Sequence, residues 1–258
     1  MSDIIPQIHA RLDALQRHHG CRLLLAAESG SRSWGHASQD SDYDVRCVYY
    51  HPQETYLSLT PPRDTIEWEL NPVFDITGWD LRKALQLALK SNISVYEWAH
   101  SPILYRSSPW LEEYRAVVEG VMQPRRLAAR YAGMAASTRK RYLGRAVVPY
   151  KEYFYAIRPL LAARWVLQER THAPVRFAEL RAALLPADMQ EEVDTLLHLR
   201  AAGKEKAAGP ARPLAESFID RELQSITDSL AATPMPDLPD PAPLDDFFRR
   251  VIRMTPTA

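Results

Sequence analysis

Two short polar motifs that interrupt apolar runs near the start of the chain constrain its fold and chemistry more than any other feature. The apolar run 23–27 leads into a Gly-Ser turn at Gly30, and Asp42 and Asp44 then open a second apolar run. Residues i and i+2 of a β-strand point to the same face of a sheet, so the pattern predicts two carboxylates side by side. Two such anions repel each other unless a cation lies between them, and Mg²⁺ with its bound phosphates is the usual partner.

The Gly-Ser turn carries the groups that a polyphosphate needs. Gly30 and Ser31 offer backbone N–H groups and a hydroxyl, and the guanidinium of Arg32 is placed to neutralise a terminal phosphate. A phosphate-binding turn beside a metal-binding acid pair is typical of phosphoryl or nucleotidyl transfer. In the alternative interpretation Gly, Ser and Asp only mark loops, where these residues are common. Asp is depleted in strands, however, so two on one face of one strand favour the functional interpretation.

The order of these motifs resembles the nucleotidyltransferase superfamily of the DNA polymerase β type. Its signature is hydrophobic-Gly-Ser, then D-x-D, then a third acid on a neighbouring strand. More narrowly, G-S-R-x-x-G at 30–35 and D-S-D-Y-D-V-R at 40–46 resemble the RNA-repair-associated nucleotidyltransferases, the RlaP or YcgL-like family. Further segments similar to that family are 74–85, 89–92, 97–102 and 153–161.

The resemblance implies a third metal-site acid at Asp75. This residue lies between Phe74 and Ile76 in a predicted strand, where an ionised carboxylate is costly to bury without a partner. The family further implies two Mg²⁺ (or Mn²⁺) ions bound by Asp42, Asp44 and Asp75, with a nucleoside triphosphate as substrate. The predicted nucleotide-binding residues are Gly30, Ser31, Arg32, Ser91, Asn92, Lys151, Tyr155 and Arg158.

Two cation-bearing segments of the second half have competing interpretations. Lys151, Tyr155 and Arg158 lie at i, i+4 and i+7, which places them on one helix face. Spacing alone favours a solvent-facing stripe, whereas the resemblance to the family's Y-x-x-R-P segment favours a grip on nucleotide phosphates and base. The segment 124–145 carries seven cations and no acid. It is either a solvated helix face or a surface that follows an RNA backbone.

Periodicity predicts an α+β fold, in which a small mixed nucleotidyltransferase sheet with flanking helices is followed by an all-helical domain. An amphipathic helix carrying Ile8, Leu12 and Leu15 comes first, and alternating or buried apolar runs then predict strands. We expect the catalytic domain at 1–100, a helical domain at 101–234, and a Pro-rich linker with a C-terminal docking helix at 235–258. The predicted strands are 21–27, 43–50, 65–70 and 73–77, and the later helices are 81–89, 109–120, 124–143, 151–169, 177–185, 188–202, 214–231 and 244–254.

Composition and charge indicate in which compartment the protein acts and which kinds of partner it binds. Apolar residues make up 46% and charged residues 25%, as in ordinary soluble domains. No apolar run is long enough to span a bilayer and no signal peptide is visible, so we expect a cytoplasmic protein with no membrane partner. Cys21 and Cys47 lie in predicted strands and are expected to be buried free thiols. The formal net charge of +0 gives no overall electrostatic case for a nucleic-acid partner.

The expected function is metal-dependent transfer of a nucleoside monophosphate from a nucleoside triphosphate to an acceptor hydroxyl. The resemblance implies an RNA end as acceptor, in a repair pathway. One alternative is transfer of AMP to a protein or small-molecule hydroxyl. Another is an inactive nucleotide-binding or antitoxin-like module, against which the presence of all three acids argues. The sequence predicts neither the base preference nor the oligomeric state.

Overall fold

The computed structural model describes residues 4–38, 41–202 and 207–254 of the chain. It contains two compact units, which are described separately. The first unit comprises residues 1–33, 42–122 and 238–258, and the second comprises 34–41 and 123–237. The first unit therefore continues past the expected boundary at residue 100 and includes the C-terminal helix.

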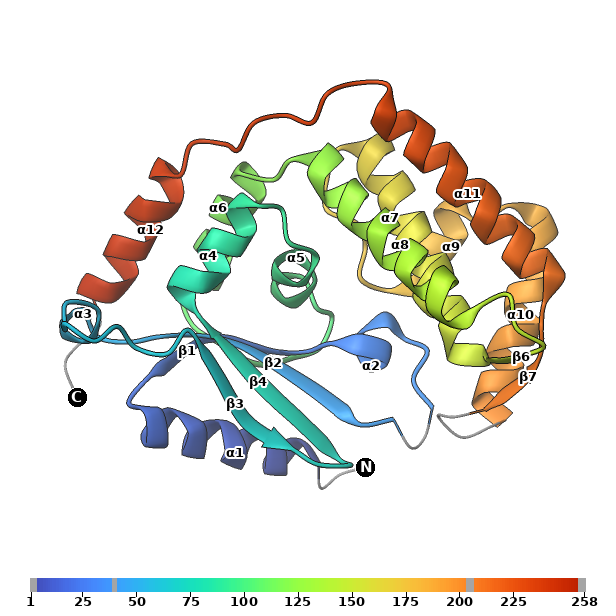
Figure 1. Ribbon diagram of the computed structural model, residues 1–258. Helices are drawn as coiled ribbons and strands as arrows, with labels where there is room; N and C mark the ends of the chain where they lie inside the picture. The colour runs from blue at the N-terminus through green and yellow to red at the C-terminus, as the bar shows by residue number, and fades with distance from the viewer. Residues whose placement is uncertain (1–3, 39–40, 203–206, 255–258) are drawn as a thin grey trace. The chain divides into compact units, whose positions relative to one another are not determined.

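A five-stranded mixed sheet with the strand order β3-β4-β2-β1-β5 forms the centre of the first unit (Figure 1). Strand β1 (Arg22–Glu28) is antiparallel to both β2 (Tyr43–Tyr50) and β5 (Leu104–Ser107). Strand β4 (Phe74–Asp80) runs parallel to β2, and β3 (Thr65–Leu70) is antiparallel to β4. The mixed sheet with flanking helices confirms the expected α+β class.

Helix α1 (Ile4–His19) covers one face of this sheet (Figure 1). Ile8, Leu12 and Leu15 are fully buried, because their spacing of four and three residues places them on one side of the helix. Gly20 ends the helix with a φ of 57°, a conformation that glycine adopts without a steric penalty. The main sheet residues that pack with this helix are Leu23, Ala26, Val45, Cys47, Tyr49, Ile66, Phe74, Ile76 and Tyr105.

Helices α4 (Leu81–Leu89) and α5 (Ile93–Ala99) lie on the opposite face from α1 (Figure 1). The side chain of Asp80 accepts a hydrogen bond from the N–H of Arg82 at 2.8 Å and so caps α4. Two short helices, α2 (Gly30–Trp34) and α3 (Gln53–Tyr56), follow β1 and β2. Cys21 and Cys47 are buried and free, as expected.

The C-terminal helix α12 (Ala242–Arg253) packs on α4 and on α6 (Leu111–Gly120) within the first unit. Its buried face consists of Leu244, Phe247, Val251 and Ile252. The ring of Phe247 lies 6.2 Å from that of Tyr114 on α6. The predicted docking helix thus docks on its own chain, and the region of 235–258 beyond residue 254 lies outside the described residues.

The second unit is mainly helical. Its helices are α7 (Pro124–Tyr142), α8 (Tyr150–Glu169), α9 (Phe177–Leu184), α10 (Ala187–Ala202) and α11 (Pro213–Ala231). A two-stranded ribbon of β6 (Val147–Pro149) and β7 (Ala208–Pro210) adds to the expected all-helical domain. Among the described residues, no helix is both long and apolar enough to cross a membrane.

Segment 34–41, which lies between the two polar motifs in the sequence, belongs to this second unit. The ring of Trp34 lies 5.1 Å from that of Tyr155, and His36 stacks on Phe154 at 4.9 Å. Arg200 donates a hydrogen bond to the carbonyl of His36 at 2.7 Å. Trp34 and His36, at the start of the insert, therefore pack against α8 and α10.

Candidate active site

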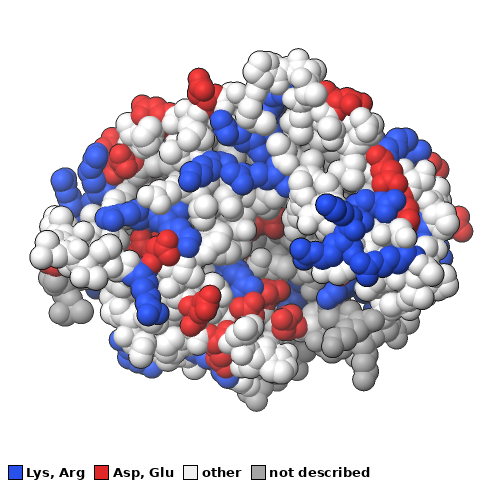
Figure 2. All heavy atoms as spheres, in the orientation of Figure 1, with Lys and Arg blue, Asp and Glu red and all other residues white. Residues whose placement is uncertain are grey.

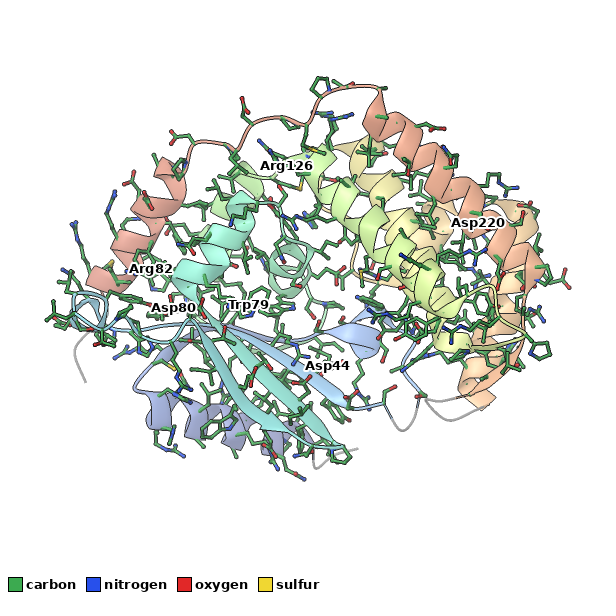
Figure 3. All side chains as sticks on the ribbon, viewed as in Figure 1. Asp44, Trp79, Asp80, Arg82, Arg126 and Asp220 are labelled. Carbon is green, nitrogen blue, oxygen red and sulfur yellow. The ribbon has the colours of Figure 1, made fainter. Side chains whose placement is uncertain are left out.

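Asp44 and Asp75 lie opposite each other on neighbouring parallel strands. The register of β2 and β4 pairs Asp44 directly with Asp75, and neighbouring strands lie about 4.8 Å apart. Figure 3 shows Asp44 on β2, on the sheet of the first unit. The structure therefore brings together the second acid of the D-x-D motif and the third acid that the family resemblance implies.

Arg46 joins these two carboxylates. Its Nη2 donates to Oδ1 of Asp44 at 2.8 Å and to Oδ2 of Asp75 at 2.7 Å. The hydrogen bond from Arg46 lowers the pKa of the Asp75 carboxyl, which outweighs the opposite effect of its partial burial. One cation is thus shared by two carboxylates, and Asp75 stays ionised at neutral pH.

Asp42 comes directly before β2 and is exposed. The D-x-D pair is therefore divided between a loop and a strand, whereas both acids were expected inside the strand. The backbone carbonyl of Asp42 accepts a hydrogen bond from Nε of Arg32 at 2.8 Å. The guanidinium of Arg32 also lies 3.8 Å from the centre of the Tyr43 ring. Arg32 thus connects the Gly-Ser turn to the first acid.

Gly30 lies against the carboxylate of Asp44. It has a φ of 60°, and a Cβ atom at this position would collide with Oδ2 of Asp44. The backbone N–H of Ser29 donates to the carbonyl of Asp44 at 2.8 Å, and Oγ of Ser33 donates to the carbonyl of Gly30 at 2.9 Å. Ser31 is buried within this turn. The predicted phosphate turn and the predicted metal ligand are therefore direct neighbours.

Glu28 is a further acid of the site that the sequence analysis did not identify. Its buried carboxylate accepts hydrogen bonds from the backbone N–H of Asp44 at 2.8 Å and from the hydroxyl of Tyr105. Burial raises the pKa of Glu28 to about 7. The available sequence signal was an acid that directly ends the buried run Leu23 to Ala27.

Ser91 and Asn92 lie between α4 and α5 of the first unit. The side chain of Asn92 accepts a hydrogen bond from the N–H of Ser94 at 2.9 Å and caps α5. Ser91 is fully buried, has a φ of 50°, and forms a side-chain hydrogen bond with Tyr96. Both predicted nucleotide contacts thus have a structural role in this turn.

Lys151, Tyr155 and Arg158 belong to the second unit. Arg158 is fully buried and donates to the carbonyl of Val175 from Nε at 3.2 Å and from Nη2 at 3.0 Å. Its guanidinium lies 4.3 Å from the centre of the Trp34 ring. The alternative of a solvent-facing stripe is therefore wrong at Arg158, whereas Lys151 and Tyr155 are half-buried.

Part of the basic segment 124–145 is used inside the second unit. Arg125 donates to the backbone carbonyls of Ser229, Leu230 and Thr233 at the end of α11. Arg126 donates to the carbonyl of Pro236. Arg139 forms a two-pronged ion pair with Asp220 of α11 at 2.7 and 2.9 Å. Figure 3 marks Arg126 on α7 and Asp220 on α11. These three cations attach α7 to α11 and to the segment that follows it.

The sheet and its acid pair beside a Gly-Ser turn define the class of protein as a nucleotidyltransferase of the DNA polymerase β type. The family described as "RNA repair pathway DNA polymerase beta family" (RlaP) matches residues 4–250, so the chain belongs to this family. The chain is also similar to the "Uncharacterized protein YcgL" of Bacillus subtilis (strain 168). The two are 36% identical over 220 residues, which cover 84% of this chain and 85% of the relative. Both findings confirm the resemblance that the motifs carry.

Proposed function

We propose that the protein transfers a nucleoside monophosphate from a nucleoside triphosphate to an acceptor hydroxyl and releases pyrophosphate. One observation carries this proposal. Asp44 and Asp75 occupy paired positions on parallel strands and share a single cation, the guanidinium of Arg46. Paired carboxylates that already share one cation suit a divalent ion as well.

The donor set fits Mg²⁺ or Mn²⁺. Asp42, Asp44 and Asp75 offer only carboxylate oxygens, the ligands that hard divalent cations prefer. Asp42 is exposed, and the side chains of Asp44 and Asp75 are each 25% exposed, so solvent ions reach them. Two bound ions would stabilise the attacking oxygen and the leaving pyrophosphate.

The residues of the chain then have separate roles. Gly30, Ser31 and Arg32 would bind the β- and γ-phosphates through backbone N–H groups, a hydroxyl and a guanidinium. Asp75 would orient the acceptor hydroxyl and accept its hydrogen bond, because its lowered pKa keeps it ionised at neutral pH. Asn92, Lys151 and Tyr155 remain proposed nucleotide contacts. Ser91 and Arg158, which were also predicted as nucleotide contacts, are fully buried, and Arg158 is hydrogen-bonded to the carbonyl of Val175.

We propose an RNA end as the acceptor, in the cytoplasm. The description of the family as part of an RNA repair pathway supports this choice. The exposed cations of the second unit, Arg130, Lys140, Arg141 and Arg145, offer contacts for an RNA backbone. Figure 2 shows Lys and Arg side chains gathered over the helical unit on the face that it draws.

A transfer assay tests this function. The protein is incubated with Mg²⁺, each of the four α-labelled ribonucleoside triphosphates, and either RNA oligonucleotides with free 3′ hydroxyls or a mixture of proteins. We expect label on RNA with the wild type, and its loss in Asp44→Asn and Asp75→Asn. Asp64→Asn is the matched control, because Asp64 is an ion-paired acid of the same unit outside the site. Label on protein alone would overturn the RNA acceptor, and full activity of Asp44→Asn would overturn the metal site.

A further inference from the structure

One nitrogen of the Arg46 guanidinium contacts both Asp44 and Asp75, two acids of the proposed metal site. A single nitrogen, Nη2, lies 2.8 Å from Oδ1 of Asp44 and 2.7 Å from Oδ2 of Asp75. Arg46 follows Asp44 by two residues on β2, so both side chains project from the same face of the sheet. The side chain of Arg46 is 17% exposed, so part of it contacts solvent.

A metal ion bound by Asp44 and Asp75 would compete with Nη2 of Arg46 for these carboxylate oxygens. Mg²⁺ binds carboxylate oxygens at about 2.0–2.1 Å and demands near-octahedral geometry. Asp44 and Asp75 would hold such an ion through carboxylate oxygens, and Nη2 now donates to one oxygen of each. Two positive charges at this separation also repel each other.

The other arm of the guanidinium is held independently. Nη1 of Arg46 donates to the backbone carbonyl of Asp75 at 2.9 Å, a bond that does not involve either carboxylate. A rotation of the guanidinium about this bond would move Nη2 away from the carboxylates and keep the side chain beside the acids. Arg46 would thus remain next to the two acids both before and after an ion binds.

We propose that Arg46 is an internal counter-ion of the site, which holds the carboxylates of Asp44 and Asp75 adjacent until a divalent ion displaces its Nη2. The proposal rests on the proposed function, because it assumes that a divalent ion binds these acids. Arg46 is a positioning residue in this scheme, and it sets the affinity for the metal: the ion must compete with a charge that is already present.

Mn²⁺ titration of the full-length protein without nucleotide tests the proposal, with free Mn²⁺ followed by electron paramagnetic resonance. The variants are Arg46→Met, which keeps the length of the side chain without its charge, and Arg46→Lys, which keeps the charge without the fork. Arg106→Met is the matched control, because it removes a half-buried ion pair with Asp13 in the same unit. Thermal unfolding of each variant, followed by circular dichroism, checks that it folds.

We expect Arg46→Met to bind Mn²⁺ about tenfold more tightly than the wild type, since one charge-assisted contact no longer competes. Arg46→Lys should fall between them, and Arg106→Met should match the wild type. An unchanged or weaker affinity in Arg46→Met, with normal binding by the wild type, would overturn the counter-ion while leaving the metal site in place. Absence of Mn²⁺ binding by every folded variant would overturn both.

A second measurement follows the wild type and does not depend on the metal affinities of the variants. The ¹⁵N signals of the arginine side chains are recorded while Mg²⁺ is added, and the Arg46 signal is assigned by its loss in Arg46→Lys. We expect the Arg46 signal to shift with the same midpoint as metal binding, and that of Arg106 to stay in place. An Arg46 signal that does not move at saturating Mg²⁺ would overturn the proposal.

Discussion

The buried carboxylate of Glu28 accepts a hydrogen bond from the backbone N–H of Asp44 at 2.8 Å. The bond joins the end of β1 to the start of β2, at the point where the D-x-D motif enters the strand. It fixes the backbone from which the Asp44 carboxylate projects. Glu28 thus positions Asp44, a proposed metal ligand, and is not itself proposed as a ligand.

Glu28→Ala should therefore harm both stability and transfer. It leaves the N–H of Asp44 and the hydroxyl of Tyr105 without their buried acceptor, which costs about 1–3 kcal/mol for each group. Urea unfolding and transfer rates measure the two effects. Glu28→Gln retains an acceptor oxygen and should restore most of the stability. Equal stability of Glu28→Ala and the wild type would show that this contact contributes nothing.

Gly30→Ala should be more harmful than the same change at Gly20. The two glycines have φ values of 60° and 57°, so the backbone penalty of roughly 1–2 kcal/mol is common to both. Only at Gly30 does a Cβ atom collide with Asp44, whereas at Gly20 it meets nothing within 4 Å. We expect transfer to be lost in Gly30→Ala and retained in Gly20→Ala. Similar transfer rates in the two variants would contradict the close packing of the turn on Asp44.

Asp80 predicts a pH dependence of stability. Burial raises its pKa above the ordinary value, against the hydrogen bonds from Tyr56 and from the N–H of Arg82. The folded state then binds the proton of Asp80 more tightly than the unfolded state does, so the contribution of Asp80 to stability is greatest below about pH 4 and falls as the pH rises through the raised pKa. Asp80→Asn keeps the helix cap and removes this fall.

Melting temperatures of the wild type and Asp80→Asn between pH 4 and pH 7 measure the effect. Their difference should grow in favour of the variant as the pH rises. Asp64→Asn is the control of opposite sign, because the hydrogen bond from Lys83 lowers the pKa of Asp64. The stability that this bond contributes is lost as the pH falls. A constant difference between wild type and Asp80→Asn would rule out the raised pKa.

The second unit offers a prediction that separates structural from nucleotide-binding cations. Arg158→Ala removes a buried donor to the carbonyl of Val175 and should destabilise the protein by about 1.5–3 kcal/mol. Lys151→Ala, at a half-buried position, should destabilise the protein less than Arg158→Ala, because Arg158 is fully buried. If Lys151 binds a phosphate, its loss should weaken binding of a non-hydrolysable triphosphate about tenfold to hundredfold.

Binding titrations with that analogue measure the effect, and Lys140→Ala is the control, because Lys140 is an exposed cation on α7. Equal affinities of Lys151→Ala and Lys140→Ala would remove Lys151 from the proposed nucleotide contacts.

The longer helices and strands could be predicted from the sequence, because their buried apolar residues recur with a regular spacing. The spacing of Ile8, Leu12 and Leu15 predicts α1, and the strands at 43–50 and 65–70 have the predicted bounds. Strand β4 was predicted to end at Thr77 but continues to Asp80, because Gly78 and Trp79 pair with β2. The short elements α2, α3, α5, β5, β6 and β7 were not predicted, because so few residues show no clear period.

The sequence by itself supplied the residues of the proposed site: the Gly-Ser turn and the acids at 42 and 44, and, through the family resemblance, the third acid at 75. These were visible because carboxylates and glycines at such spacing oppose the local preference for an apolar strand. Only the tertiary structure decided their partners. Arg46 reaches Asp75 and Glu28 reaches Asp44 because strands distant in the sequence pair in one register. Likewise, Arg158 is a buried donor because the tertiary fold brings the carbonyl of Val175 next to its guanidinium. No local sequence pattern predicts this contact.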